Sequence, residues 1–116
     1  LKYLQQLYVD HRSASVNAQA KLKKLDVSKN KSLVYLFANG NELTDIDLTN
    51  NIYLQQLYIG DNNLTSINLD NNTNLINVML ANNKFTFATL PLPGNWNQYD
   101  YYQRNMAIAP HIRWAT

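Results

Sequence analysis

The fold of this chain can be inferred from one stretch, LQQLYIGDNNLTSINL at Leu54–Leu69. Its first five letters, LQQLY, also occur at Leu4–Tyr8. Aligned leucines recur with a 21-residue period, at Leu33, Leu54 and Leu75, and the unit has the pattern LxxLxLxxNxLxxIxLxxNxx. A strict repeat of this length indicates supersecondary units that stack on one another, because one unit alone cannot bury its apolar face.

Each unit contains the LxL alternation twice, at nearly half the period. Alternating apolar residues predict a short strand with one buried face. Two such strands joined by turns form one flattened coil, and stacked coils share a continuous core. The chain is therefore predicted to be mostly β, a solenoid of about four coils with parallel strands.

Asparagines recur in the same register at two positions of the unit. An Asn side chain can satisfy backbone groups that a tight turn leaves unpaired, so we expect stacked asparagines to form ladders along the solenoid. The alternative is that they are polar loop filler. The two sets are Asn41, Asn62, Asn83 and Asn30, Asn51, Asn72.

The motif LxxLxLxxNxL resembles the signature of leucine-rich repeats. The second half of the unit, with Leu25-Asp26-Val27, Ile46-Asp47-Leu48 and Ile67-Asn68-Leu69, is similar to the 21-residue bacterial class with the consensus ending LDLxxN. The resemblance covers residues 1–92. It implies a right-handed, curved parallel β solenoid used for binding, mostly of proteins, with no fixed catalytic residues. It also implies a secreted or surface-anchored protein similar to those of gut Bacteroidetes.

The amino-acid composition disfavours several classes of function and site. The net charge of +2 and a charged fraction of 16% do not favour nucleic acid as a partner. There are no cysteines for disulfides or thiolate metal sites, and no apolar run is long enough for a membrane span. The chain opens inside the repeat pattern, so we expect a segment of a longer protein, monomeric, with any targeting signal upstream.

The repeat is interrupted near its start, where the segment 11–21 is eight residues longer than the pattern allows. Its composition is compatible with a short helix or a protruding loop. One interpretation is a tolerated surface insertion, and the other is a recognition loop beside the binding face.

The pattern also decays after Phe85, and Pro93 stands where the second asparagine set would continue. Residues 93–116 are rich in aromatic side chains. An open solenoid end exposes core and strand edges, so this segment is predicted to be an irregular C-terminal cap. The alternatives are an aromatic ligand site or the start of a following domain.

Outward positions of the first strand in each unit form columns that are predicted to face solvent. Contiguous exposed apolar surface marks interaction sites, and tyrosine beside amides is a common recognition mixture. We therefore expect a protein or glycan ligand here, although the same aromatic residues could simply stabilise the sheet. The candidate ligand-binding residues are Gln6, Tyr35, Gln56, Asn77 in one column and Tyr8, Phe37, Tyr58, Met79 in the next.

No pattern in the chain indicates catalysis or a cofactor. His11 and His111 lie in irregular segments, outside any hydrolase motif. Asp26 and Asp47 could attract a cation from the polar half of the unit, but no calcium-loop spacing accompanies them, and no metal site is predicted. The sequence thus favours a non-catalytic binding module, with a structural spacer as the alternative.

Overall fold

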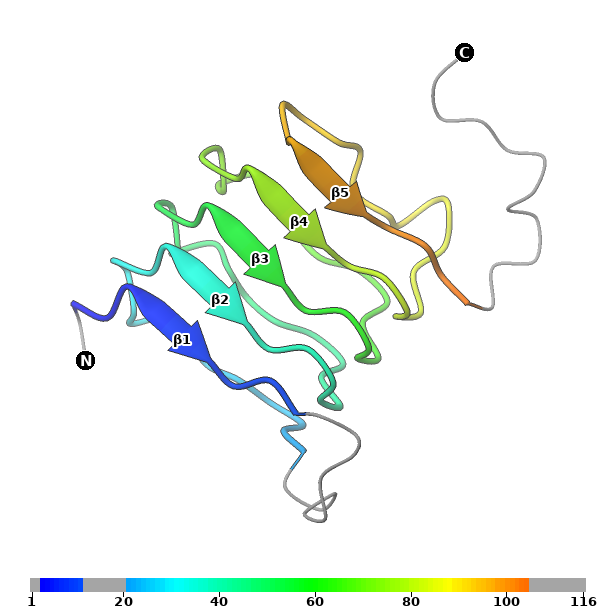
Figure 1. Ribbon diagram of the computed structural model, residues 1–116, viewed down its shortest axis with the longest axis horizontal. Helices are drawn as coiled ribbons and strands as arrows, with labels where there is room; N and C mark the ends of the chain where they lie inside the picture. The colour runs from blue at the N-terminus through cyan, green and yellow to red at the C-terminus, as the bar shows by residue number, and fades with distance from the viewer. Residues whose placement is uncertain (1–2, 12–20, 105–116) are drawn as a thin grey trace.

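A computed structural model describes residues 3–11 and 21–104 of the chain. They form five short parallel strands: β1 (Gln6–Tyr8), β2 (Tyr35–Phe37), β3 (Gln56–Tyr58), β4 (Asn77–Met79) and β5 (Gln98–Asp100). The strands lie side by side in the order β1-β2-β3-β4-β5, and from β2 to β5 each connection runs behind the sheet before the next strand begins (Figure 1). The prediction of a parallel β solenoid is confirmed, and no helix occurs in these two ranges.

The strands pair in the register that the sequence repeat predicts. Leu36 pairs with Leu57, which pairs with Val78, so three complete turns of the repeat carry the chain from β2 to β5. The step from Leu7 in β1 to Leu36 is eight residues longer than the repeat. Most of that difference falls in residues 12–20, so the expected helix or loop of the insert lies outside the described residues.

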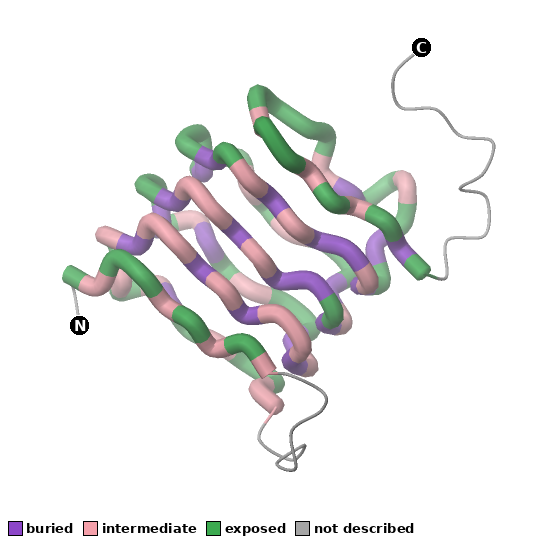
Figure 2. Tube along the Cα trace, in the orientation of Figure 1, coloured by how far each residue is buried: buried purple, intermediate pink, exposed green. Residues whose placement is uncertain are grey.

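The core lies inside the coils, behind the sheet. Leu36, Leu57 and Val78 point inward from the middle strands and are almost fully buried. Burial falls toward the two ends of the stack, where the middle residue of β1 and of β5 is only half-buried (Figure 2). Interior coils are therefore covered on both sides, while in the described part of the chain each end strand pairs with a neighbour on one side only.

One left-handed residue precedes each asparagine of the first set. Gly40, Asp61 and Asn82 have φ values of 77°, 53° and 58° and stand one unit apart. Gly, Asp and Asn tolerate this conformation better than other residues. At Gly40 a Cβ would also run into the backbone carbonyl of His11. This conformation turns the chain sharply inward, so that the side chain of the next residue enters the coil.

The inward-turned asparagines bond to two coils at once. The Asn62 side-chain amide donates to the carbonyls of Ala38, Ile59 and Gly60 at 3.0–3.1 Å, and its Oδ1 accepts the N–H of Leu43 at 3.0 Å. Equivalent bonds are made by Asn41 and Asn83. All three residues are buried. Each side chain thus satisfies backbone groups that the turn would otherwise bury unpaired.

The second asparagine set ties the opposite turns together. Asn51 Nδ2 donates to the carbonyls of Val27 and Asn30, and Asn72 Nδ2 donates to those of Leu48 and Asn51. Asn30 itself is half-buried, whereas Asn51 and Asn72 are buried. The amide of one coil therefore reaches the backbone of the coil before it.

Strand pairing continues past residue 92, into the segment that was expected to cap the repeats. Val78 pairs with Tyr99, and Trp96 stands one unit after the inward-pointing Leu75. Trp96, Tyr99 and Tyr101 pack against the core, with ring centroids 4.8 Å apart for the first pair and 5.1 Å for the second. Aromatic side chains occupy inward positions that leucines hold elsewhere. Residues 93–104 therefore add a fifth strand and cover the end of the core with larger side chains.

Tyr99 connects this aromatic cluster to the preceding loop. Its hydroxyl donates to the carbonyl of Pro91 at 2.7 Å. Burial raises the pKa of the Tyr99 hydroxyl, with a further contribution from Tyr101. The phenol therefore stays protonated and keeps its hydrogen at neutral pH. Of the two other aromatic residues of the expected cap, Tyr102 is exposed and Trp114 lies outside the described residues.

Gln103 completes the first asparagine ladder at the last coil. Its Oε1 accepts from the N–H groups of Asn83 and Phe85, and its Nε2 donates to the carbonyls of Leu80, Tyr101 and Tyr102. The residue one full unit after Asn83 is Arg104, so Gln103 stands one position before the ladder register. The additional methylene of glutamine lets the amide reach the same place from one position earlier in the chain.

We expect Gln103→Ala to destabilise the last coil by about 2–3 kcal/mol, because buried backbone N–H groups lose their acceptor. Hydrogen exchange should accelerate at the Asn83 and Phe85 amides, and urea denaturation should show the loss of stability. Gln98→Ala, which removes an exposed glutamine from β5, is the matched control and should change little. Equal behaviour of the two variants would show that the Gln103 amide does not stabilise the last coil.

Candidate functional site

An exposed row of aromatic rings crosses the first three strands. Tyr8 stacks on Phe37 and Phe37 stacks on Tyr58, each pair with ring centroids 4.6 Å apart and interplanar angles of 26° and 4°. Neighbouring strands lie about 4.8 Å apart, so in-register parallel pairing itself places flat rings one above the other. Tyr8 remains 60% exposed, while Phe37 and Tyr58 are partly covered by their neighbours.

Met79 and then Asp100 continue this row on β4 and β5. We call the five residues Tyr8, Phe37, Tyr58, Met79 and Asp100 the stripe. Beside it runs a column that is polar apart from the ring of one tyrosine: Gln6, Tyr35, Gln56, Asn77 and, on β5, Gln98. The structure thus brings together all eight candidate binding residues on one face of the sheet and adds two from β5.

A shallow hollow of about 160 Å³ lies at the β5 end of the stripe. It is lined by Tyr58, Asn77, Val78, Met79, Gln98 and Asp100. Sequence reasoning missed Gln98 and Asp100 because the repeat was taken to end before them. The signal was present, since both residues stand one full repeat after the candidates Asn77 and Met79.

A third outward column lies two positions after the first four strands and helps to hold the sheet together: Asp10, Asn39, Gly60 and Ala81. The N–H of Asn39 donates to Asp10 Oδ1 at 2.8 Å, and the N–H of Gly60 donates to Asn39 Oδ1 at 2.7 Å. A Cβ on Gly60 would lie 3.1 Å from the carbonyl oxygen of Ala81 and 3.3 Å from Asn39 Oδ1. These side chains therefore continue the hydrogen bonding of the sheet beyond the ends of the strands.

The second half of each unit carries acidic side chains, and two of these accept hydrogen bonds from residues of their own turns. Asp47 Oδ1 accepts from the hydroxyl of Thr49 at 2.6 Å and from its N–H at 2.9 Å, and Asp26 accepts from Ser28 in the same way. These bonds hold the pKa of both carboxyl groups below the ordinary value for aspartate. Residues 3–11 and 21–104 contain no cluster of three or more His, Cys, Asp or Glu side chains that could hold a metal ion.

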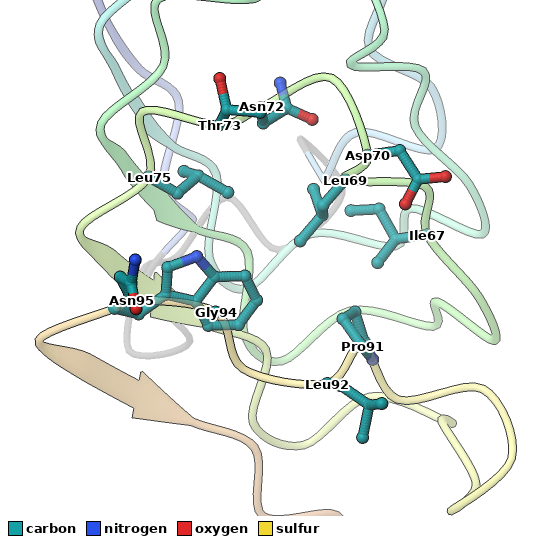
Figure 3. A pocket seen from close by; sticks show the side chains of 11 residues that line it. Ile67, Leu69, Asp70, Asn72, Thr73, Leu75, Pro91, Leu92, Gly94 and Asn95 are labelled. Carbon is teal, nitrogen blue, oxygen red and sulfur yellow. The ribbon is translucent and has the colours of Figure 1, made fainter.

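A larger hollow of about 540 Å³ opens near the last coil, on the side of the second asparagine ladder. Pro91 and Leu92 lie across it from Asn72 and Thr73 (Figure 3). Pro93 takes the next ladder position and has no side-chain amide to donate to the coil before it. This end of the stack is therefore less tightly tied than the interior coils.

His11 belongs neither to the stripe nor to the lining of the hollow at its end. His11 directly follows the third-column residue Asp10, and its N–H donates to the Asn39 carbonyl at 2.8 Å. His111 lies outside the described residues. No helix in the described part of the chain is long and apolar enough to cross a membrane.

Comparisons with family models, curated proteins and solved structures find no match. The repeat geometry and the surface of the sheet are therefore the observations from which a function is inferred.

Proposed function

We propose that the chain is a non-catalytic binding module that recognises another protein through the face of its five-stranded sheet. The observation that carries the proposal is the outward-facing stack of Tyr8, Phe37 and Tyr58 across three strands, in which Tyr8 is exposed and the other two rings are partly exposed. An apolar row in a solvent-facing position is a typical interaction surface, and tyrosine is enriched among residues that dominate binding energy.

The shape of the face favours a protein over a small molecule. The residues are spread over five parallel strands, and the hollow at the end of the stripe is large enough for about one side chain. A glycan is the second candidate, because stacked rings beside the amides of Gln6 and Gln56 could also receive sugar rings. A small molecule would instead need a concave site that encloses most of its surface.

The assignment of the chain to a repeat family is also a proposal. We infer that the chain is a leucine-rich repeat of the 21-residue bacterial class, a right-handed curved stack of about four coils. The motif LxxLxLxxN, the constant 21-residue step and the buried ladder asparagines support it. On this basis the chain would be part of a longer secreted or surface protein with repeats over residues 1–92 and a cap or linker over 93–116.

The alternative is a structural spacer without a ligand. One observation favours it: the Tyr8–Phe37 and Phe37–Tyr58 stacks also stabilise pairing of the strands that carry them. The two functions predict different results when the rings are removed. A spacer loses stability only, whereas a binding module loses its ligand.

Replacement of Tyr8, Phe37 and Tyr58 together by serine is expected to abolish binding while the solenoid stays folded. Binders are first selected on the full chain from a displayed library of random peptides and from an array of oligosaccharides. Their affinity for the variant is then measured by titration calorimetry, and we expect a loss of at least about a hundredfold, because central aromatic anchors are worth about 2 kcal/mol or more each.

The matched control replaces Tyr3, Ile52 and Tyr53 by serine. These three side chains are also large and exposed, but they lie outside the strands. The control should bind like the unmodified chain. Failure to select any ligand that depends on the stripe rings, or an equal loss in both triple variants, would contradict the proposed site and favour the spacer.

A further inference from the structure

The charge on the sheet face has one sign. Within residues 3–11 and 21–104, the outward strand residues and the outward position after each strand include two charged side chains, Asp10 and Asp100. The whole chain nevertheless carries a net charge of +2. Its exposed lysines, such as Lys23, Lys24 and Lys29, lie outside the strands. The sheet face is therefore an acidic surface on a weakly basic protein.

The two carboxylates are not equivalent. Asp10 Oδ1 accepts the N–H of Asn39 and so helps to hold the edge of the sheet. Asp100 stands at the end of the stripe, in register with Met79, and lines the hollow of about 160 Å³ together with Tyr58. The hollow thus combines a carboxylate, a thioether and an aromatic ring with the amides of Asn77 and Gln98.

This combination matches a long basic side chain. The methylenes of arginine or lysine pack along apolar surface while the charged head reaches a polar partner. Met79 is flexible and polarisable, which suits contact with such a stem, and a guanidinium can pair with a carboxylate through two hydrogen bonds. The ring of Tyr58 adds attraction for a nearby cation.

We propose that the protein partner places an arginine or lysine side chain over Met79 against Asp100 and covers Tyr58, Phe37 and Tyr8 with apolar side chains. The inference rests on the proposed function and names the chemistry of its partner. The rings supply apolar area, and Asp100 fixes the direction in which the partner lies along the stripe. The acidic sign of the face opposes nucleic acids and anionic lipid surfaces, whose phosphates carry the same charge.

The test uses the full chain and a displayed library of random peptides. Selected peptides should be enriched in sequences with one basic residue beside apolar residues. A synthetic peptide from this set should bind about tenfold more weakly to Asp100→Asn, which keeps the shape of the side chain and removes its charge. Its affinity for the unmodified chain should also fall as salt is added.

The matched control is Asp45→Asn, which removes an exposed carboxylate from the other half of the coil. It should leave the affinity unchanged. A second arm replaces the basic residue of the peptide by glutamine. Asp100→Asn should then weaken binding of the altered peptide much less, because two residues in contact show coupled effects.

The outcomes separate this inference from the proposed function. Peptides that need the stripe rings, yet carry no basic residue or bind Asp100→Asn and the unmodified chain equally, would overturn the inference and leave the binding face in place. An equal loss in Asp45→Asn would also overturn it, because the effect would then reflect net charge. If no peptide depends on the rings, both proposals fail.

Discussion

Asn62→Leu is expected to unfold the solenoid or to lower its free energy of unfolding by about 3–5 kcal/mol. Leucine has the same branched shape as asparagine but makes none of its hydrogen bonds. The buried N–H of Leu43 would lose its acceptor. The carbonyls of Ala38, Ile59 and Gly60 would each lose one of two donors, because Asn41, Asn83 and the N–H of Gly40 still bond to them. Each buried backbone group left unpaired costs about 1–3 kcal/mol, against a total stability of about 5–15 kcal/mol for a domain.

The control for this variant is Asn71→Leu in the next coil. Asn71 is exposed and donates one hydrogen bond, to the carbonyl of Thr49 at 3.1 Å. Its replacement should cost less than about 1 kcal/mol, because water replaces the lost partner. Urea denaturation followed by circular dichroism gives both values. Equal stability losses would mean that burial of the ladder amide is not what holds the turns.

Leu57→Ala is expected to cost about 3–5 kcal/mol of stability. Leu57 is fully buried in β3 between Leu36 and Val78, so truncation removes apolar contact and leaves a cavity that neighbours on both sides cannot fill. The cavity also lies in the middle of the stack. Since each coil contacts only its neighbours, it weakens the coupling between the two ends as well.

The same substitution at Leu7 is the matched comparison. Leu7 occupies the same column but lies in β1 at the end of the stack and is only half-buried. We expect Leu7→Ala to cost only about 1–2 kcal/mol, because a half-buried side chain loses less apolar contact and leaves no closed cavity. Thermal unfolding of the two variants by calorimetry measures the difference. A larger loss at Leu7 would mean that the first coil contributes more to stability than the interior of the stack does.

Much of the fold and most of the candidate site could be predicted from the repeat. In a stack of parallel strands, a constant 21-residue step places equivalent residues side by side. For this reason the aromatic row of Tyr8, Phe37 and Tyr58 could be stated in advance, with Met79 as its continuation. The turn positions of the two asparagine sets followed from the same register.

The last coil was not predictable in the same way. Its residues occupy the same places in the coil as those of earlier units, but they are of different types. Trp96 and Tyr99 hold inward positions as aromatic side chains, which a leucine pattern does not identify. Gln103 performs the task of a ladder asparagine from one residue earlier, so it is out of register with Asn83. A search for identical letters therefore ends the repeat near residue 92, although the strand pairing continues to Asp100.

The sequence by itself determined the period, the strand register, the inward leucines and the identity of the stacked rings, because these depend only on spacing along the chain. Tertiary structure alone decided that a fifth strand closes the described stack, that Gln103 replaces an asparagine, and that Asp100 borders a hollow beside Met79. These features depend on how far a side chain reaches in space, and the longer side chain of Gln103 reaches the ladder from one position earlier in the chain.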